Sequence, residues 1–217
     1  MENMDILKFV HRLKCGSSGS QYKISIVDAE KNIRGYFVPI TDKSLNETQI
    51  ILKLTQWRRE NSQFFQTRFN PTPERTKNWL QNVVLPNNRT ILFLIYYDDK
   101  LVGHYGFKDI VNGVASADNL LIGDTKMRGP VSILAMITLF KWGFDELGLN
   151  EITGTILKSN QASLLIHRRL HFREVRSVPL VAKISDNGDV SLLEMPSATD
   201  YDDINVHVSL KKEDFVY

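Results

Sequence analysis

Hydrophobic residues recur at two different periods along the chain, and the change from one period to the other predicts its elements. Helical spacing, as in Ile50, Leu54 and Trp57, is typical of a helix with one apolar face. Short runs of β-branched and aromatic residues, such as TILFLIYY, are typical of strands. We therefore expect strands at 33–40, 90–97, 101–110, 114–123, 150–157, 172–181, 190–195 and 204–210, and helices at 45–60, 73–84, 130–148 and 160–170.

The order of these segments predicts an α/β (α+β) fold built on a mixed, mostly antiparallel sheet. Turn residues at 98–100 and at Asn112-Gly113 join three consecutive strands into an antiparallel meander. The long apolar helix at 130–148 then links two strands by a β-α-β crossover. Such a pattern places helices on both faces of the sheet. We assign residues 31–217 to a single domain.

An N-terminal extension at 1–30 precedes this domain and gives no clear pattern. Within it, GSSGSQ at 16–21 is typical of a flexible turn or linker. The extension lacks the apolar core of a signal peptide, and no apolar run reaches the roughly 18 to 20 residues that span a membrane. The single Cys15 is typical of a reducing compartment. We therefore expect a cytoplasmic protein with no membrane partner.

The composition is that of a soluble globular protein, with 42% hydrophobic and 24% charged residues. A formal net charge of +2 is too small to indicate a nucleic-acid partner. The basic runs WRRE and HRR are ordinary for a solvated helix face. The chemistry must therefore be sought in local motifs.

The loop DTKMRG, between the strand at 114–123 and the following helix, is a candidate phosphate site. The first N–H groups of a helix have no partner within the helix, and the helix dipole is positive there. Arg128 adds a positive charge, and Gly129 lets the backbone approach a ligand closely. Pro130 has no N–H, which leaves Val131, Ser132 and Ile133 as donors. The alternative is a tight strand-to-helix loop without a ligand.

The stretch KSNQASLLIHRRLHF completes a recognisable order of motifs: a strand, an R-G loop, a long helix, a strand, S-N-Q-A, a short helix and a final Phe. This order resembles the GNAT superfamily of N-acetyltransferases. The runs LTQWRRE and LKSN resemble more closely the branch that acetylates nucleotide-linked amino sugars, as in the pseudaminic acid pathway. The resemblance covers residues 45–176.

The resemblance implies acetyl-CoA as co-substrate, bound at a site that the crossover forms, and no metal. A backbone N–H of Leu121 or Ile122 would face the thioester carbonyl. His167 falls where the family has a tyrosine, and would protonate the leaving thiolate. The alternative is that His167 is a half-exposed helix residue. The cofactor-binding residues implied are Leu121, Ile122, Arg128, Gly129, Val131, Ser132, Ile133 and Asn160.

The acceptor amine would lie on the other side of the slot between the two strands of the crossover. The candidate bases are Asp118, whose side-chain direction depends on strand register, Asn119 acting through a water, and His104. Arginines suit a diphosphate, and an aromatic ring can stack on a base or sugar. The alternative is that the tryptophan is core and the arginines are solvated. The candidate acceptor-binding residues are Trp57, Arg58, Arg59, Arg68 and Tyr105.

Three functions remain open. The first is an N-acetyltransferase for a nucleotide-linked amino sugar in glycan biosynthesis. The second is the same chemistry on a protein or a small amine. The third is a non-catalytic acyl-CoA-binding relative, favoured by Pro130 in the glycine loop and by His167 in place of the tyrosine. The long apolar helix and the late strands also allow a homodimer.

Overall fold

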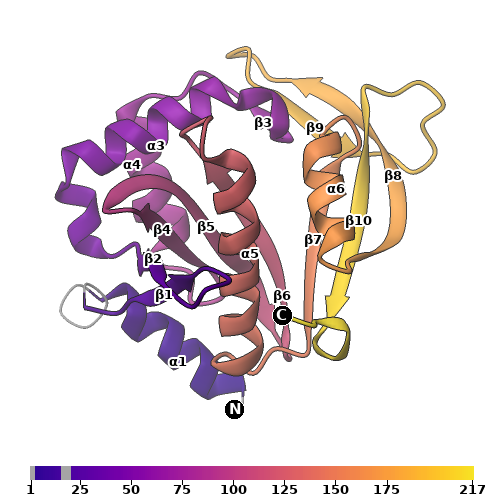
Figure 1. The fold of residues 1–217 in the computed structure, drawn as a ribbon. Coiled ribbons are helices and arrows are strands. Elements are labelled where there is room, and N and C mark those ends of the chain that lie inside the picture. The colour runs from indigo at the N-terminus through magenta and orange to yellow at the C-terminus, as the bar shows by residue number, and fades with distance from the viewer. Residues whose placement is uncertain (1–2, 16–20) are drawn as a thin grey trace.

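The computed structural model describes residues 3–15 and 21–217, in which a long, strongly curved sheet carries helices on both faces (Figure 1). The strands are β1 Ile24–Val27, β2 Ile33–Pro39, β3 Thr67–Arg68, β4 Ile91–Tyr97, β5 Lys100–Val111, β6 Val114–Ile122, β7 Glu151–Leu157, β8 Arg173–Ile184, β9 Val190–Glu194 and β10 Asp203–Lys211. The α-helices are α1 Asn3–Lys14, α3 Thr48–Glu60, α4 Pro73–Trp79, α5 Arg128–Asp145 and α6 Gln161–Arg169.

The described strands form one sheet in the order β1-β2-β4-β5-β6-β7-β10-β8-β9-β3. Among these strands, β6 and β7 pair in parallel, and the other neighbours pair antiparallel. The helix between β6 and β7 is α5, as the β-α-β crossover requires. The predicted fold class, a mixed and mostly antiparallel sheet with one crossover, is therefore confirmed.

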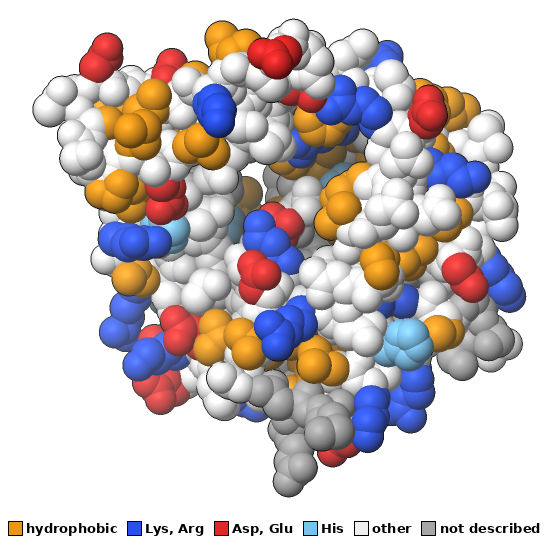
Figure 2. Space-filling view, turned by 180° about the vertical axis from the view of Figure 1, so that it is seen from behind, with side chains coloured by type: hydrophobic (Ala, Val, Ile, Leu, Met, Phe, Trp, Pro, Cys, Tyr) orange, Lys and Arg blue, Asp and Glu red, His pale blue; other side chains and the backbone are white. Residues whose placement is uncertain are grey.

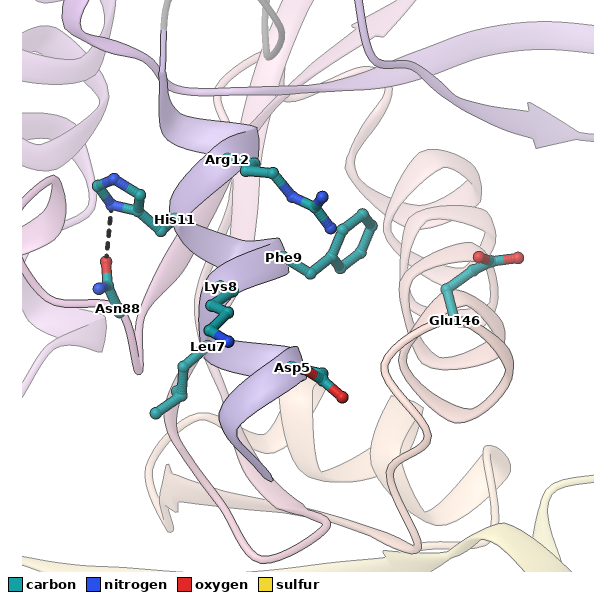
Figure 3. A pocket seen from close by; sticks show the side chains of 8 residues that line it. All are labelled: Asp5, Leu7, Lys8, Phe9, His11, Arg12, Asn88 and Glu146. Carbon is teal, nitrogen blue, oxygen red and sulfur yellow. Dashed lines mark hydrogen bonds between the residues drawn. The ribbon is translucent and has the colours of Figure 1, made fainter. Parts of the chain in front are cut away.

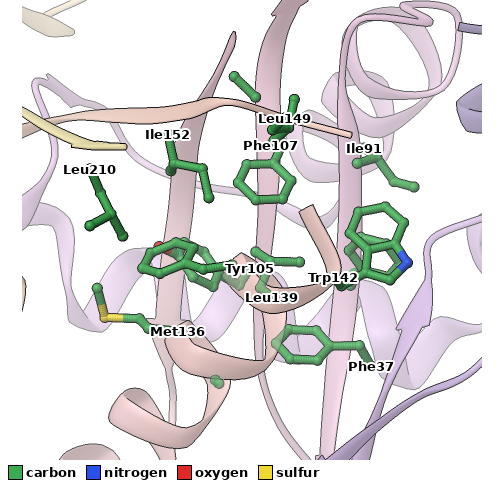
Figure 4. Close-up of a cluster of buried hydrophobic side chains, with 14 of the residues drawn as sticks. Phe37, Ile91, Tyr105, Phe107, Met136, Leu139, Trp142, Leu149, Ile152 and Leu210 are labelled. Carbon is green, nitrogen blue, oxygen red and sulfur yellow. The ribbon is translucent and has the colours of Figure 1, made fainter. Parts of the chain in front are cut away.

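One face of the sheet packs against α1 and α5 through the larger hydrophobic cluster (Figure 4). Trp142 of α5 lies at its centre, stacked on Phe107 with a 6.3 Å centroid separation and edge-on to Phe93 at 5.2 Å. The opposite face packs against α3 and α4 through a second cluster that includes Leu54, Leu80 and Leu92. Two separate apolar layers thus fix the strands between them.

The N-terminal residues join the same fold. In α1, the side chains of Ile6, Val10 and Leu13 are buried in the larger cluster. Lys14 is also buried, and its Nζ donates hydrogen bonds to the carbonyl oxygens of Val84, Asn87 and Thr90. Strand β1 pairs with β2, so the expected boundary at residue 30 falls in the turn between them. Residues 16–20 of the predicted linker lie outside the described residues.

Several element ends differ from the predicted ones. A 3-10 turn at Asp42–Asn46 precedes α3, with Ser44 Oγ accepting the Thr41 N–H at 3.1 Å, and α3 itself begins only at Thr48. The helix that was expected to begin near Pro130 begins at Arg128, and it ends at Asp145. Across residues 3–15 and 21–217, none of the helices has the length and apolar character needed to cross a membrane.

Candidate active site

A cleft opens where β6 and β7 separate. The two strands pair only from Val114 to Ser116 and from Glu151 to Thr153, and beyond these residues they diverge. The resulting cleft has a volume of about 690 Å³. It is bordered by β5, β6 and β7, by the first turns of α5 and α6, and by α3, α4 and the segment between them. Figure 2 shows the molecule hollowed near the middle of this face, with both basic and acidic side chains beside the hollow.

The edge of β6 presents backbone groups to this cleft. The Gly123 N–H donates to the carbonyl oxygen of Val102 on β5, so strand alternation directs the N–H of Ile122 away from β5. The Ile122 carbonyl points the same way and accepts from Arg128 Nε at 3.1 Å. A bulge precedes these residues, with Asn119 at φ +59°. Of the two predicted oxyanion donors, Ile122 rather than Leu121 therefore faces the cleft with its N–H.

The first turn of α5 provides a second set of backbone donors. Arg128, Gly129 and Ser132, three of the predicted cofactor-binding residues, line the cleft. A Cβ atom added at Gly129 would meet nothing within 4 Å, so a ligand has room at this position. Because the helix begins at Arg128, the first free N–H groups belong to Arg128 and Gly129.

Two predicted phosphate donors need correction. The N–H of Val131 donates to Met127 O at 3.1 Å, and its side chain is buried in the core. Ile133 lies a full turn inside the helix, where its N–H is used within the helix. Neither residue lines the cleft. The early start of α5 moves the unpaired N–H groups toward the N-terminus.

Asn160 stands at the start of α6, on the opposite wall of the cleft. Its Oδ1 accepts the Ser163 N–H at 3.2 Å, which caps the helix. Both residues line the cleft. The side-chain amide of Asn160 therefore lies where the resemblance expects a contact to the cofactor, although its oxygen already caps α6.

His167 is a buried member of α6 and is only 8% exposed. Its Nδ1 lies 2.8 Å from the Ser163 carbonyl oxygen, which can only accept, so Nδ1 carries the proton. Nε2 is then the lone-pair nitrogen of a neutral ring. Burial lowers the pKa of His167 to about 4. At neutral pH this ring has no proton on Nε2 to give, which argues against the predicted acid role in the absence of a further charge.

His104 on β5 is also buried and lines the cleft. Burial lowers its pKa to about 4, although a hydrogen bond to the backbone of Asn119 opposes the shift. Its Nδ1 has no hydrogen-bond partner among the described residues. The ring lies 6.4 Å from that of Trp57. His104 is thus a neutral imidazole with one unused nitrogen at the cleft.

Asp118 on β6 is the second predicted base, and it also lines the cleft. Its carboxylate lies 3.2 Å from Lys108 Nζ and accepts a hydrogen bond from the Asn119 side chain. With 33% of its side chain exposed, it is more accessible than His104. Asp118 therefore offers a negative charge to a positively charged amine in the cleft.

The structure separates the five predicted acceptor-binding residues into two groups. Arg58 and Tyr105 line the cleft. Trp57 is 6% exposed and packs in the second cluster, against Gly123. Arg59 turns away and donates to Pro71 O at 3.0 Å. Arg68 does not line the cleft, and its buried Nε has no hydrogen-bond partner within the described residues.

Aromatic and basic side chains alternate along one wall of the cleft. The Arg58 guanidinium lies 3.4 Å from the centre of the Phe65 ring, and the Arg75 guanidinium lies 4.3 Å from that of Phe69. Burial lowers the pKa of Arg58 to about 10, so it stays charged at neutral pH. Five further residues of this lining were not predicted from the sequence, namely Phe64, Phe65, Arg75, Trp79 and Lys108. The cluster of aromatic residues in SQFFQTRF was the available signal.

A second hollow of about 760 Å³ lies between α1 and the end of α5 (Figure 3). Arg12 lies over the Phe9 ring at 6.0 Å, and Glu146, just past the end of α5, also lines the hollow. None of the predicted site residues lines this hollow. Across the described ranges, no group of three or more His, Cys, Asp or Glu side chains could hold a metal ion.

Residues 36–173 match a protein family described as acetyltransferase (GNAT) domain. No curated protein sequence matches the chain. Many solved structures share the fold. One is a probable GNAT-family acetyltransferase from Chromobacterium violaceum ATCC 12472, 15% identical, with a TM-score of 0.65 over 90% of this chain and 95% of that one.

Two further structural neighbours contain bound ligands. RimL, a ribosomal L7/L12 alpha-N-protein acetyltransferase in complex with coenzyme A, is 16% identical, with a TM-score of 0.62 over 88% of this chain and 98% of that one. The microcin C7 self-immunity acetyltransferase MccE, in complex with acetyl-CoA and AMP, is 15% identical. Its TM-score is 0.60, over 83% of this chain and 93% of that one. At these identities the likeness concerns the fold.

Proposed function

Since the chain belongs to the GNAT family of acetyltransferases, with acetyl-CoA as co-substrate, we propose that its acceptor is the amino group of a small anionic molecule, best represented by a nucleotide-linked amino sugar. The observation that carries this proposal is Arg58, a charged side chain on the cleft for which the described residues place no carboxylate within ion-pair distance. Its contacts are with the neutral Thr67 and with the Phe65 ring, and a half-buried cation without a counter-charge favours a ligand that brings an anion.

The groups proposed to hold acetyl-CoA lie on the side of the cleft formed by α5 and α6. Arg128 and the free N–H groups of Arg128 and Gly129 suit the pyrophosphate. Asn160 and Ser132 offer polar contacts next to it. The diverging edges of β6 and β7 suit an extended chain with amide groups, which can pair with a strand edge. The bound acetyl-CoA supplies an activated thioester.

The Ile122 N–H is proposed to stabilise the oxyanion that forms when the amine attacks the thioester carbonyl. The new C–N bond forms, the C–S bond breaks, the amine loses a proton, and the thiolate gains one. Asp118 is the preferred group to attract the ammonium form and accept its proton, because it is more accessible than His104.

His167 retains a conditional role as the acid. A thiolate forming beside the ring would raise the pKa of His167, because an opposite charge favours the imidazolium. In that role the neutral ring first takes a proton on Nε2 from solvent and then passes it to the thiolate. Without such a charge, the lone pair on Nε2 makes His167 a hydrogen-bond acceptor.

The acceptor side supports a nucleotide more than a bare amine. Phe64 and Trp79 line the cleft beside Arg58, and Phe64 is 42% exposed, so a flat ring can stack there. Arg58 donates to Thr67 through one nitrogen only, which leaves other donors for phosphate oxygens. The MccE structure holds AMP together with acetyl-CoA on the same fold, which further supports a nucleotide-bearing acceptor.

A non-catalytic acyl-CoA-binding protein is the second candidate function. Two observations favour it, namely the missing N–H at Pro130 and the low pKa of His167. Retained acetyl-CoA binding without turnover on any amine would identify it. A protein acceptor is disfavoured by the positive charge of the same Arg58 on the cleft.

We also propose a cytoplasmic location, which the single Cys15 supports. A homodimer is supported by four exposed apolar side chains on or beside β8 and β9, namely Val175, Ile184, Leu193 and Met195. Light scattering coupled to size-exclusion chromatography tests the dimer.

The test begins with isothermal titration of acetyl-CoA into the wild-type protein and an Arg128→Gln variant, which should bind more weakly. A thiol-release assay then uses UDP-, dTDP- and GDP-linked amino sugars. For the best acceptor, Arg58→Gln should raise KM at least about tenfold, as expected for losing a charged hydrogen bond. The matched control is Arg59→Gln, since Arg59 lies outside the cleft. An equal effect of both changes would contradict the acceptor role of Arg58.

A further inference from the structure

Two short segments from opposite halves of the molecule join across the cleft. Strand β3 follows α3, and it pairs with β9 through Thr67 with Ser191 and Arg68 with Val190. The Leu192 N–H also donates to Gln66 O at 2.8 Å. Figure 1 shows β3 extending from the end of α3 to β9, so that the two halves meet above the gap between β6 and β7. We call residues 66–68 and 190–192 the clasp.

An ion pair fixes the clasp at its side. Arg75 of α4 donates from both terminal nitrogens to Asp189, at 3.3 and 2.6 Å. Asp189 is itself held in a tight turn, where its N–H donates to the side chain of Asn187. Gly188 makes this turn with φ +82°. The two-pronged contact therefore joins two segments that are each already ordered.

The clasp lies on the acceptor side of the cleft. Its residue Thr67 accepts two hydrogen bonds from Arg58 of α3, and the Arg75 of its ion pair belongs to α4. Both helices pack on the face opposite to α5. The first turns of α5 and α6, proposed to hold acetyl-CoA, enter the cleft from the other face. An acceptor must therefore reach the thioester from beneath the clasp.

We propose that the clasp, held by the Arg75–Asp189 ion pair, limits the acceptor to a small molecule that fits within the cleft and excludes an extended polypeptide. This inference rests on the proposed acetyltransferase function. A peptide segment commonly binds by adding a strand to a free sheet edge or by lying in an open groove. Here the free edge of β9 is already occupied by β3. Of the clasp residues, Gln66 and Thr67 line the cleft, so the pairing stands at its border.

The test uses two conjugates of CoA that need no knowledge of the natural acceptor. In one, the CoA sulfur is joined through an acetyl spacer to glucosamine. In the other, the same spacer is joined to the N-terminus of a ten-residue peptide. Titration calorimetry should show that the glucosamine conjugate binds at least as tightly as acetyl-CoA. The peptide conjugate should bind about tenfold more weakly or worse, because its chain has no path past the clasp.

An Asp189→Ala variant breaks the ion pair at a residue outside the cleft lining. It should bind the glucosamine conjugate as the wild type does and the peptide conjugate more tightly, so that the difference between the two affinities becomes smaller. The matched control is Arg34→Ala, which removes an ion pair of 3.0 Å with Asp98 at a distant turn. Equal affinity of the wild-type protein for both conjugates would overturn the inference. An unchanged difference between the two affinities in Asp189→Ala would overturn the role of the ion pair. Failure of acetyl-CoA itself to bind would instead contradict the proposed function.

Discussion

Acidification should unfold this protein through two buried histidines. His104 and His167 are 5% and 8% exposed, and burial lowers the pKa of each from 6.5 to about 4. Between these values the unfolded chain binds more protons than the folded one, so stability falls as the pH falls. The full shift corresponds to about 3.4 kcal/mol for each histidine. Between pH 7 and pH 5, linkage lowers the free energy of unfolding by about 2 kcal/mol for each histidine, or about 4 kcal/mol for the pair.

The assay is urea unfolding at pH 7 and pH 5, followed by tryptophan fluorescence and by circular dichroism. His167→Phe keeps a ring in the apolar site and removes the titrating group. Between the two pH values, its free energy of unfolding should therefore fall by about 2 kcal/mol less than that of the wild type. The exposed His171, changed to Asn to suit its φ of +67°, is the matched control. Identical pH dependence of the wild type and His167→Phe would refute the reasoning.

Three further changes test the packing around the site. Gly123→Ala places a Cβ 1.9 Å from the Trp57 ring. Urea titrations should show a free energy of unfolding lower by about 1–3 kcal/mol. A variant as stable as the wild type would contradict the observed contact. In Gly129→Ala the added Cβ meets nothing within 4 Å, so the melting temperature should be unchanged. Calorimetry should nevertheless show weaker acetyl-CoA binding, and an unchanged affinity would remove Gly129 from the site. Lys14→Met leaves three carbonyl oxygens without their donor. Thermal unfolding should show a free energy of unfolding lower by about 1–3 kcal/mol. An unchanged stability would show that water replaces the ammonium.

The sheet and its crossover could be predicted because their residues alternate or recur with little ambiguity. The run at 90–97 and the long apolar helix before Glu151 are strong signals of this kind. The N-terminal helix was missed although Ile6, Val10 and Leu13 follow helical spacing, because the glycine- and serine-rich run behind it suggested a linker.

The composition of the site depended on geometry that the sequence does not contain. Trp57 and Arg58 are neighbours, yet consecutive residues on a helix point about 100° apart, so one is core and the other lines the cleft. The bulge at Asn119 decides which backbone N–H faces the cleft. No residue pattern in the sequence predicted this bulge. The charge state of His167 follows from its burial, which a lone histidine in a basic run does not reveal.

The position of β10 between β7 and β8 has a consequence for how the molecule is made. Both of these strands leave the ribosome before the strand that joins them, so the outer edge of β7 stays unpaired until residues 203–211 have been synthesised. During that interval β7 can pair with a strand of another chain. The wall of the cleft that carries β7 is therefore completed late in synthesis, and a nascent chain halted before β10 should be prone to aggregation.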